Sequence, residues 1–538
     1  MFANEIENCP FTDFFLHILK VFQKISPIWS TKMIPIIHQI STKRSSQFFE
    51  KILIALIITF AALQLIASFH SLYFDRDEVR KLLRTAGYTE EQFIQLTYNS
   101  KVLSVNQVVD QYQTPCNSCE IKPTIASLTS SKEHPPLYYI LLQKWLLTIG
   151  SKLNPKVFSS LISIATIPAI YWLASELFKD RYSALISAAL FSLSPYQFSV
   201  SQHISQYALW GFLSCLSTAF LLRFTDVNPK TKSRKIQLVT AYTVINVMGL
   251  YTHLFYGLLI FTHSVYLYIV RSWRMLKLQL ISFLTSLLFL VPWILGIIVN
   301  FDRFRETSRI DLVSSDASSK NLLSNLLTGF TFLTQMFWRK SNISLLNNDF
   351  IESPIIIFIS IISLIALSYF LFKKTLRIQT CLLVLLGLYL TSLPLMLLGD
   401  VLDHALASKV RYYLPAVILV FTGLSFLISE QLKRSDKRKY FGAFLLTLII
   451  LTSTASTTNL FLKVMSNKSQ GVQLGPGYER AASAINASDR PLVISQEEYV
   501  KVLMLSHRLK TTTDLILMPN SENFADAIAL QKERYKEL

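Results

Sequence analysis

Long runs of apolar residues, separated by short basic turns, dominate the chain. A helix needs roughly 20 apolar residues to cross the hydrocarbon core of a bilayer. Eleven runs approach this length with no charge in their middle, and each predicts a membrane-spanning helix: 51–69, 157–177, 182–199, 206–222, 236–252, 254–270, 278–299, 351–372, 378–398, 412–429 and 440–462. The pattern therefore predicts an α-helical polytopic membrane protein with about 11 transmembrane helices.

Composition supports this class. Of the 538 residues, 51% are hydrophobic and only 16% are charged, whereas soluble domains carry about 25% charged residues. The mean hydropathy of +0.39 excludes intrinsic disorder as well as an ordinary soluble enzyme. The net charge of +18 would suggest nucleic acid as a partner of a soluble protein, but in a membrane protein it records orientation, and we expect no nucleic-acid partner.

The distribution of basic residues predicts the orientation of the chain. Residues 137–150 form a short apolar stretch that contains Lys144, which suits an interfacial helix better than a crossing. If this stretch does not cross, every strongly basic turn falls on one side, and basic turns stay cytoplasmic. These turns contain Lys179 and Arg181, Arg223 to Lys235, Arg271 to Lys277, Lys373 to Arg377, and Lys433 to Lys439.

This topology divides the chain into three parts. Residues 1–46 form a cytoplasmic amphipathic segment, and residues 47–462 form the transmembrane domain. This domain has a large extracytoplasmic first loop, 70–156, and a second extracytoplasmic loop, 300–350. Residues 463–538 form an extracytoplasmic tail. Its pattern predicts a small α/β module with strands at Pro491–Ser495 and Leu515–Met518, and helices near Glu479–Ile485, Glu497–His507 and Phe524–Lys536.

Adjacent carboxylates, Asp77 and Glu78, follow the first span and are expected at the outer surface of the membrane. A carboxylate there can accept a proton from a hydroxyl or hold a divalent cation such as Mg²⁺ or Mn²⁺ against a phosphate. The alternative is a solvated helix start, because acidic residues favour the first turn of a helix.

A second candidate site is the start of the short apolar stretch, His134-Pro135-Pro136-Leu137-Tyr138-Tyr139. Proline is tolerated at a helix N-terminus, where free N–H groups bind anions, so His134, Pro135 and Tyr138 are candidate substrate contacts. The alternative is a plain helix start with interfacial tyrosines.

Further polar groups are expected at the outer ends of the spans. These candidate substrate-binding residues are Gln202, His203, Tyr207, His253, Arg411 and Tyr412. Each has an ordinary explanation, such as a hydrogen-bonded histidine or a snorkelling arginine. The predicted topology nevertheless places all of them on one face, which favours a pocket for a lipid-phosphate substrate.

With these motifs in order, the chain resembles glycosyltransferase family 39, which includes the protein O-mannosyltransferases and aminoarabinose transferases, and most closely its cyanobacterial-type branch. The likeness covers nearly the whole chain. It rests on Asp77-Glu78 with Ala86-Gly87-Tyr88-Thr89, the His134 to Tyr139 motif, Ser194-Pro195 with Gln206-Tyr207, Tyr251-Thr252-His253, Arg411-Tyr412 with Leu414-Pro415, and Pro491 to Ser495.

The resemblance implies the class-C glycosyltransferase fold and a sugar donor carried on polyprenyl phosphate. It implies transfer to an acceptor hydroxyl on the extracytoplasmic face of the plasma (inner) membrane, with inversion of the anomeric centre and Asp77 as the general base. Glu78 would support Asp77 or hold a cation, and His134, Pro135 and Arg411 would contact the donor phosphate. The acceptor class stays open among protein, glycolipid and polysaccharide.

The chain departs from the family pattern at one loop. Relatives typically read Gln-Glu-Ala-Arg where this chain reads Gln202-His203-Ile204-Ser205, so an acid and an arginine are missing. This departure keeps open a non-catalytic subunit that binds a lipid-linked sugar. A polytopic transporter is the other alternative. It would be expected to carry ionisable residues near span centres, and we find no such pattern in the sequence. Cys116 and Cys119 in the first loop are expected to form a local disulfide, and unpaired thiols are the alternative.

Overall fold

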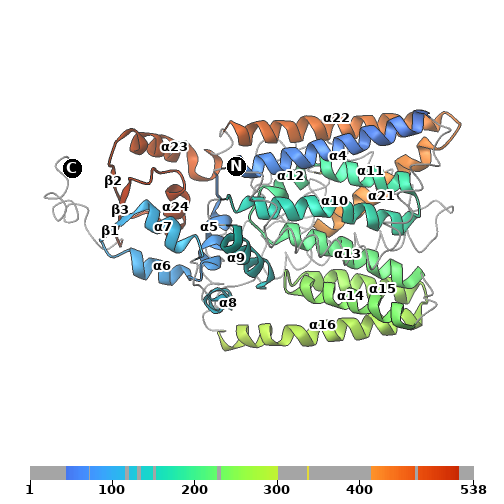
Figure 1. The fold of residues 1–538 in the computed structure, drawn as a ribbon, viewed down its shortest axis with the longest axis horizontal. Helices are drawn as coiled ribbons and strands as arrows, with labels where there is room; N and C mark the ends of the chain where they lie inside the picture. The colour runs from blue at the N-terminus through green and yellow to red at the C-terminus, as the bar shows by residue number, and fades with distance from the viewer. Residues whose placement is uncertain are drawn as a thin grey trace, which may run out of the picture.

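The computed structural model describes residues 44–71, 73–115, 120–129, 135–149, 153–226, 232–300, 336–337, 414–466 and 471–519. A bundle of long helices carries a smaller α/β module at one end (Figure 1). The bundle contains α4 (Arg44–His70), α10 (Lys156–Phe178), α11 (Arg181–Leu193), α12 (Pro195–Ser201), α13 (Tyr207–Asp226), α14 (Lys232–Leu250), α15 (Tyr256–Ile269), α16 (Trp273–Val299), α21 (Leu414–Leu432) and α22 (Arg438–Met465).

Six of the described helices, α4, α10, α13, α16, α21 and α22, are long and apolar enough to cross a membrane. Many lipid-facing positions of α16 and α22, such as Leu288 and Leu451, are apolar and exposed, as expected of a surface in contact with hydrocarbon. The chain is therefore an integral membrane protein. The count of eleven spans stays a prediction, and the predicted spans 351–372 and 378–398 lie outside the described residues.

The predicted span 182–199 is not one helix, because α11 ends at Leu193 and α12 begins at Pro195. Proline has no N–H to continue the hydrogen-bond ladder, but it fits the first position of a new helix. Ser194 caps this helix by accepting a hydrogen bond from the backbone of Gln197. The break leads the chain into the turn that contains His203.

Helix α10 lies at the centre of the bundle and packs against α4, α11, α12, α13 and α21. Its C-terminal end meets the basic turns, where Lys433 pairs with Asp180 and Arg181 pairs with Glu50, each at 2.8 Å. Its first residue, Lys156, lies at the opposite end, where it pairs with Glu78 of the first loop. The bundle thus separates a basic end from the end that carries the first loop and the tail.

The first loop folds into short helices: α5 (Arg76–Thr85), α6 (Glu90–Thr97), α7 (Val105–Tyr112), α8 (Ile121–Thr129) and α9 (Leu137–Ile149). The first three each begin with a capping box, in which the residue before the helix and the third helical residue satisfy each other's backbone N–H groups. The box residues are Asp75 with Glu78, Thr89 with Gln92, and Ser104 with Gln107. Local sequence therefore fixes where each short helix starts.

The module is built from two distant parts of the chain. Strands β1 (Val102–Ser104), β2 (Leu492–Ser495) and β3 (Asp514–Leu517) form a sheet in the order β1-β3-β2. Strand β3 pairs antiparallel with β1 from the first loop and parallel with β2 from the tail. Helices α23 (Gly471–Ala487) and α24 (Tyr499–Ser506) complete it, and α24 packs on α5, α6 and α7. The predicted tail strands are present, but the sheet also needs a strand from the first loop.

Candidate functional site

The site begins at the N-terminus of α5, between the bundle and the module. Asp75 Oδ1 accepts a hydrogen bond from the backbone of Glu78, and Glu78 Oε2 accepts one from the backbone of Asp75, both at 2.9 Å. Both side chains are buried, each in a residue that is 1% exposed. The alternative interpretation expected a solvated helix start, whereas the two carboxylates that cap α5 are buried.

Glu78 joins three elements. Its Oε1 atom accepts a hydrogen bond from the backbone N–H of Ile204 at 2.8 Å and lies 3.1 Å from Lys156 Nζ. Oε2 lies 3.2 Å from the same ammonium. Lys156 is itself buried, so the ion pair has little competition from water. The carboxylate thereby ties α5 to the start of α10 and to the turn between α12 and α13.

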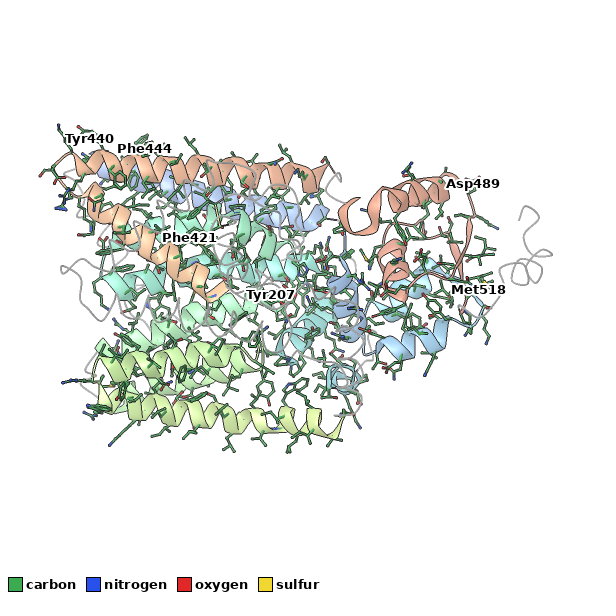
Figure 2. The ribbon with its side chains drawn as sticks, turned by 180° about the vertical axis from the view of Figure 1, so that it is seen from behind. Tyr207, Phe421, Tyr440, Phe444, Asp489 and Met518 are labelled. Atoms are coloured by element: carbon green, nitrogen blue, oxygen red, sulfur yellow. The ribbon has the colours of Figure 1, made fainter. Side chains whose placement is uncertain are left out.

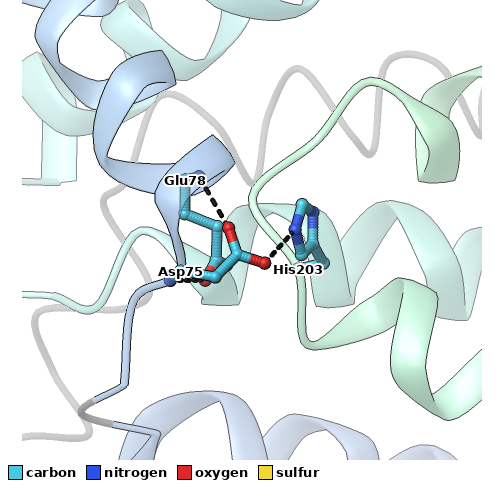
Figure 3. A group of neighbouring side chains, drawn as sticks. All are labelled: Asp75, Glu78 and His203. Atoms are coloured by element: carbon cyan, nitrogen blue, oxygen red, sulfur yellow. Dashed lines mark hydrogen bonds and ion pairs between the residues drawn. The ribbon is translucent and has the colours of Figure 1, made fainter. Parts of the chain in front are cut away.

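Asp75 pairs with His203, whose Nε2 atom lies 2.8 Å from Asp75 Oδ2 (Figure 3). Burial alone would raise the pKa of Asp75, and so would the neighbouring charge of Asp77. The charge of His203 and its hydrogen bond outweigh these effects, with help from Lys81, and hold the pKa of Asp75 below its ordinary value. Asp75 is therefore a carboxylate at neutral pH, and the Nε2–H group of His203 donates to it.

Aromatic rings extend the site away from the carboxylates. Lys81 Nζ lies 5.9 Å from the ring centroid of Tyr207, and the Tyr207 ring lies 6.0 Å from that of His253. His253 stacks on Trp210 with a centroid separation of 4.4 Å, and its Nδ1 atom accepts a hydrogen bond from the backbone of Phe255. Tyr207 lies inside the chain near the junction of bundle and module (Figure 2). Asp75, Glu78, Lys156 and His203 are called the cluster from here on. The two predicted residues Tyr207 and His253 thus lie on one side of it.

Helix α9 contributes Tyr138, which is fully buried and shares a 2.7 Å hydrogen bond with Ser159 of α10. Burial raises the pKa of Tyr138, with smaller upward effects from Tyr139 and Glu78. Pro135 is also buried, but the N–H group of Leu137 at the helix start donates to the carbonyl oxygen of Tyr251 at 3.0 Å. One of the N–H groups expected to bind an anion is therefore already used.

The turn between α12 and α13 holds polar atoms whose hydrogen bonds are incomplete. Gln202 donates to the carbonyl oxygen of Gln64 at 2.8 Å. Gln202 Oε1, His203 Nδ1 and Ser205 Oγ are all buried without a hydrogen-bond partner among the described residues. Because such atoms are costly to leave unsatisfied, they suit a ligand with hydroxyl or phosphate oxygens.

The predicted residues fall into three groups. Glu78 and His203 are members of the cluster, and Tyr138, Gln202, Tyr207 and His253 lie beside it, whereas Pro135 is buried at the start of α9. Asp77 lies in the first turn of α5, half-buried and close enough to affect Asp75 electrostatically, whereas the cluster bonds described above are made by Asp75 and Glu78. Three of the predicted residues, His134, Arg411 and Tyr412, lie outside the described residues, as do Cys116 and Cys119.

Sequence reasoning missed Asp75, Lys81 and Lys156 as members of the site. A signal for the two lysines was available, because the predicted topology places both on the extracytoplasmic side, where basic residues are less frequent. Asp75 carried the signal of a helix cap, three residues before Glu78. The pairing of these residues across the chain has no counterpart in local sequence.

The tail covers the start of α5. The His507 ring lies against that of Phe74 in a tilted arrangement, with a centroid separation of 4.2 Å, and it shares a 2.8 Å hydrogen bond with Gln113. Burial lowers the pKa of His507 to about 4, with a further contribution from Lys156. Arg76 forms an ion pair with Glu498, and Arg80 donates to the hydroxyl of Tyr499 at 3.0 Å. Helix α5 therefore binds the module through its arginines and positions the buried carboxylates at its start.

The cluster is a poor fit for a divalent cation. Ligand-type atoms of Asp75, Glu78 and His203 lie within 4.8 Å of one another. However, Mg²⁺ and Mn²⁺ need several free oxygen ligands, while both oxygens of Glu78 already face the Lys156 ammonium and backbone N–H groups. A cation at these atoms would also be repelled by that ammonium.

Comparisons with solved structures support the fold. The chain matches ArnT from Cupriavidus metallidurans with a TM-score of 0.50 at 12% identity, over 91% of this chain and 89% of ArnT. The same ArnT bound to undecaprenyl phosphate matches with a TM-score of 0.49 at 11% identity, over 89% and 88% of the two chains. No family model matches the chain, and no curated protein does.

An oligosaccharyltransferase from Archaeoglobus fulgidus, tethered with an acceptor peptide, matches with a TM-score of 0.48 at 11% identity over 88% of this chain. This chain spans only 65% of that protein, less than two thirds of its length. At 12% identity, the likeness to ArnT shows a shared fold alone. ArnT has the class-C glycosyltransferase fold, so the match to it confirms the expected fold class at that level, whereas membership of family 39 and of its cyanobacterial-type branch stays a prediction.

Proposed function

We propose that the protein is a membrane glycosyltransferase that moves a sugar from polyprenyl phosphate to an acceptor hydroxyl on the extracytoplasmic face. One observation carries the proposal: in a fold shared with ArnT, buried carboxylates, a buried lysine and a histidine meet at the end of the bundle that also carries the first loop and the tail. In the proposed topology, a lipid phosphate would approach this site from the bilayer and a hydrophilic acceptor from water.

In the proposed reaction, the acceptor oxygen attacks the anomeric carbon while the bond to the lipid phosphate breaks, which inverts the anomeric centre. The acceptor proton passes to a carboxylate, for which we propose Asp77. Asp77 is half-buried, so it is more accessible to an acceptor than Asp75 or Glu78. Glu78 positions its neighbours and does not accept the proton, because its oxygens are bonded to Lys156 and to two backbone N–H groups.

The departing phosphate needs N–H or cationic partners. We propose His203 for this role in its imidazolium form, which donates Nε2–H to Asp75 and offers the phosphate its Nδ1–H group, because Nδ1 is buried without a partner among the described residues. The proposed pocket also includes Gln202, Tyr207, Tyr138 and His253. His134, Pro135, Arg411 and Tyr412 keep their place in the proposal from sequence alone.

The transporter alternative is less well supported. In the six described candidate spans, the acidic and basic side chains lie near the helix ends, as Lys156 and Glu176 do in α10. His263 lies midway along α15, where hydrogen bonds with Thr218 and Tyr242 hold it inside the bundle. Transporters place ionisable residues near span centres, where their substrates and coupling ions bind.

Reconstitution tests the proposal directly. The protein in lipid vesicles would be given undecaprenyl-phosphate-linked pentoses and hexoses with peptide, glycolipid and polysaccharide acceptors. We expect one donor to yield glycosylated acceptor and an equal amount of undecaprenyl phosphate. Saturable donor binding without cleavage across the panel would support a non-catalytic subunit instead, and movement of intact donor between leaflets would support a transporter.

A further inference from the structure

Lys156 occupies an unusual position for a lysine. It is 1% exposed, at the first residue of α10, with its Nζ atom 5.3 Å from the ring centroid of Phe74. Burying an ammonium costs several kcal/mol unless it is paired, and its partner here is a carboxylate that is equally buried. The positive charge is therefore a fixed part of the site.

The Glu78 carboxylate has no acceptor capacity left for another cation. A carboxylate offers about four lone-pair positions, and four contacts use them. Oε1 faces Ile204 N at 2.8 Å and Lys156 Nζ at 3.1 Å, while Oε2 faces Asp75 N at 2.9 Å and Lys156 Nζ at 3.2 Å. The ammonium thus occupies the place at Glu78 that a metal ion would take.

Asp75 is similarly committed. Its Oδ1 atom caps α5, and its Oδ2 atom accepts from His203. A divalent cation would have to break the Asp75–His203 hydrogen bond and displace Lys156, leaving a buried ammonium unpaired. The three potential ligands are close together, but Glu78 is already paired with Lys156 and Asp75 with His203.

We propose that the Lys156 ammonium replaces a divalent cation at this site, so that the protein binds none there and transfers sugar without one. Lys156 is a positioning residue in this scheme: it holds Glu78, and through Glu78 it holds the start of α5 and the turn of His203. The claim about transfer rests on the proposed function, whereas the claim about binding does not.

Manganese binding tests the proposal without any sugar. The full chain, purified in detergent after chelator treatment, would be titrated with Mn²⁺ and followed by electron paramagnetic resonance. We expect no Mn²⁺ bound at this site in the wild type. Lys156→Met removes the ammonium and leaves three ligands, so we expect one Mn²⁺ per chain, bound at least about tenfold more tightly than by the wild type.

Two matched variants control for unrelated sites. Lys156→Met with Glu78→Gln loses the carboxylate and should lose the new Mn²⁺ signal, while Lys156→Arg keeps the charge and should not acquire it. One Mn²⁺ per wild-type chain that Glu78→Gln abolishes would overturn the proposal. This wild-type result can be read even if Lys156→Met fails to fold.

Transfer gives a separate readout. In the reconstituted assay, we expect activity to be unchanged by a chelator and not to increase with Mg²⁺ or Mn²⁺. Activity that a chelator abolishes and Mn²⁺ restores would overturn the metal-free scheme while leaving the proposed function intact. Absence of transfer under every condition would instead count against the proposed function, with the Mn²⁺ titration still decisive for Lys156.

Discussion

The Nε2 atom of His203 lies 2.8 Å from Oδ2 of Asp75, although the two residues are 128 positions apart. This bond fixes the imidazole and leaves Nδ1 as the buried atom without a partner among the described residues. One nitrogen is thus structural, and the other is available to a ligand. The two roles can be separated by substitution.

The amide nitrogen of glutamine can reach the position of Nε2, and that of asparagine the position of Nδ1. We expect His203→Gln to keep the bond to Asp75 and the wild-type melting temperature but to weaken undecaprenyl phosphate binding about tenfold or more, as for a lost charge-assisted hydrogen bond. His203→Asn should bind undecaprenyl phosphate like the wild type but lose the bond to Asp75 and melt at a lower temperature. Thermal unfolding and lipid-phosphate binding in detergent measure both, with undecaprenol as the control ligand. Equal binding by His203→Gln and the wild type would rule out Nδ1 as a phosphate contact.

Removing one partner of the Glu78–Lys156 ion pair should destabilise the protein more than removing both partners. Lys156→Met leaves a buried carboxylate without its ammonium, and we expect a loss of about 3–5 kcal/mol in the free energy of unfolding. The double variant with Glu78→Gln should recover part of this loss, because no unpaired charge remains. Denaturant unfolding in detergent measures the cycle. Additive losses in the double variant would show that the two side chains do not interact.

Acid should loosen the tail from α5. His507 has a pKa of about 4 in the folded chain, against 6.5 for an ordinary histidine. Between these values the unfolded or undocked state binds more protons, so stability falls as the pH falls from about 6.5 to about 4. We expect faster proteolysis of the module at pH 4.5 than at pH 7. His507→Phe keeps the ring against Phe74 and should reduce this difference, whereas an identical pH response in the variant would exclude His507 as its cause.

The orientation of the chain is testable by labelling. In a background with all five cysteines replaced, Asp489→Cys places a thiol on the exposed surface of the module, and Ser435→Cys places one in a basic turn. A maleimide that cannot cross membranes should label position 489 in intact spheroplasts and position 435 only after permeabilisation. Labelling of both from one side would contradict the proposed topology.

Local sequence predicted what depends on short-range physics. Apolar run length located α4, α10 and α22. The exception is the run 182–199, where Ser194-Pro195 carries no charge and so does not interrupt the apolar pattern. The missing N–H group of Pro195 nevertheless ends the helix there. The two tail strands were similarly visible from their short apolar runs.

Long-range pairing was not predictable in this way. Nothing near Val102 indicates that it will face Ile516 across the sheet. Likewise, Asp77 and Asp75 are both acids at one helix start, and only the approach of His203 and the burial around Asp75 distinguish them. Which carboxylate enters the cluster depends on the three-dimensional approach of α10 and α12.

The central claim is that this site transfers sugar from a lipid phosphate with Asp77 as the base. The most direct measurement is the initial rate of transfer in vesicles by the wild type, Asp77→Asn and the control Asp489→Asn, whose side chain lies in the module away from the cluster. We predict that Asp77→Asn inserts and binds undecaprenyl phosphate normally but loses at least about 100-fold in rate, as expected for a missing general base, while Asp489→Asn keeps the wild-type rate. A wild-type rate for Asp77→Asn would contradict this assignment of the base, and absence of transfer by the wild type from every donor would contradict the proposed function.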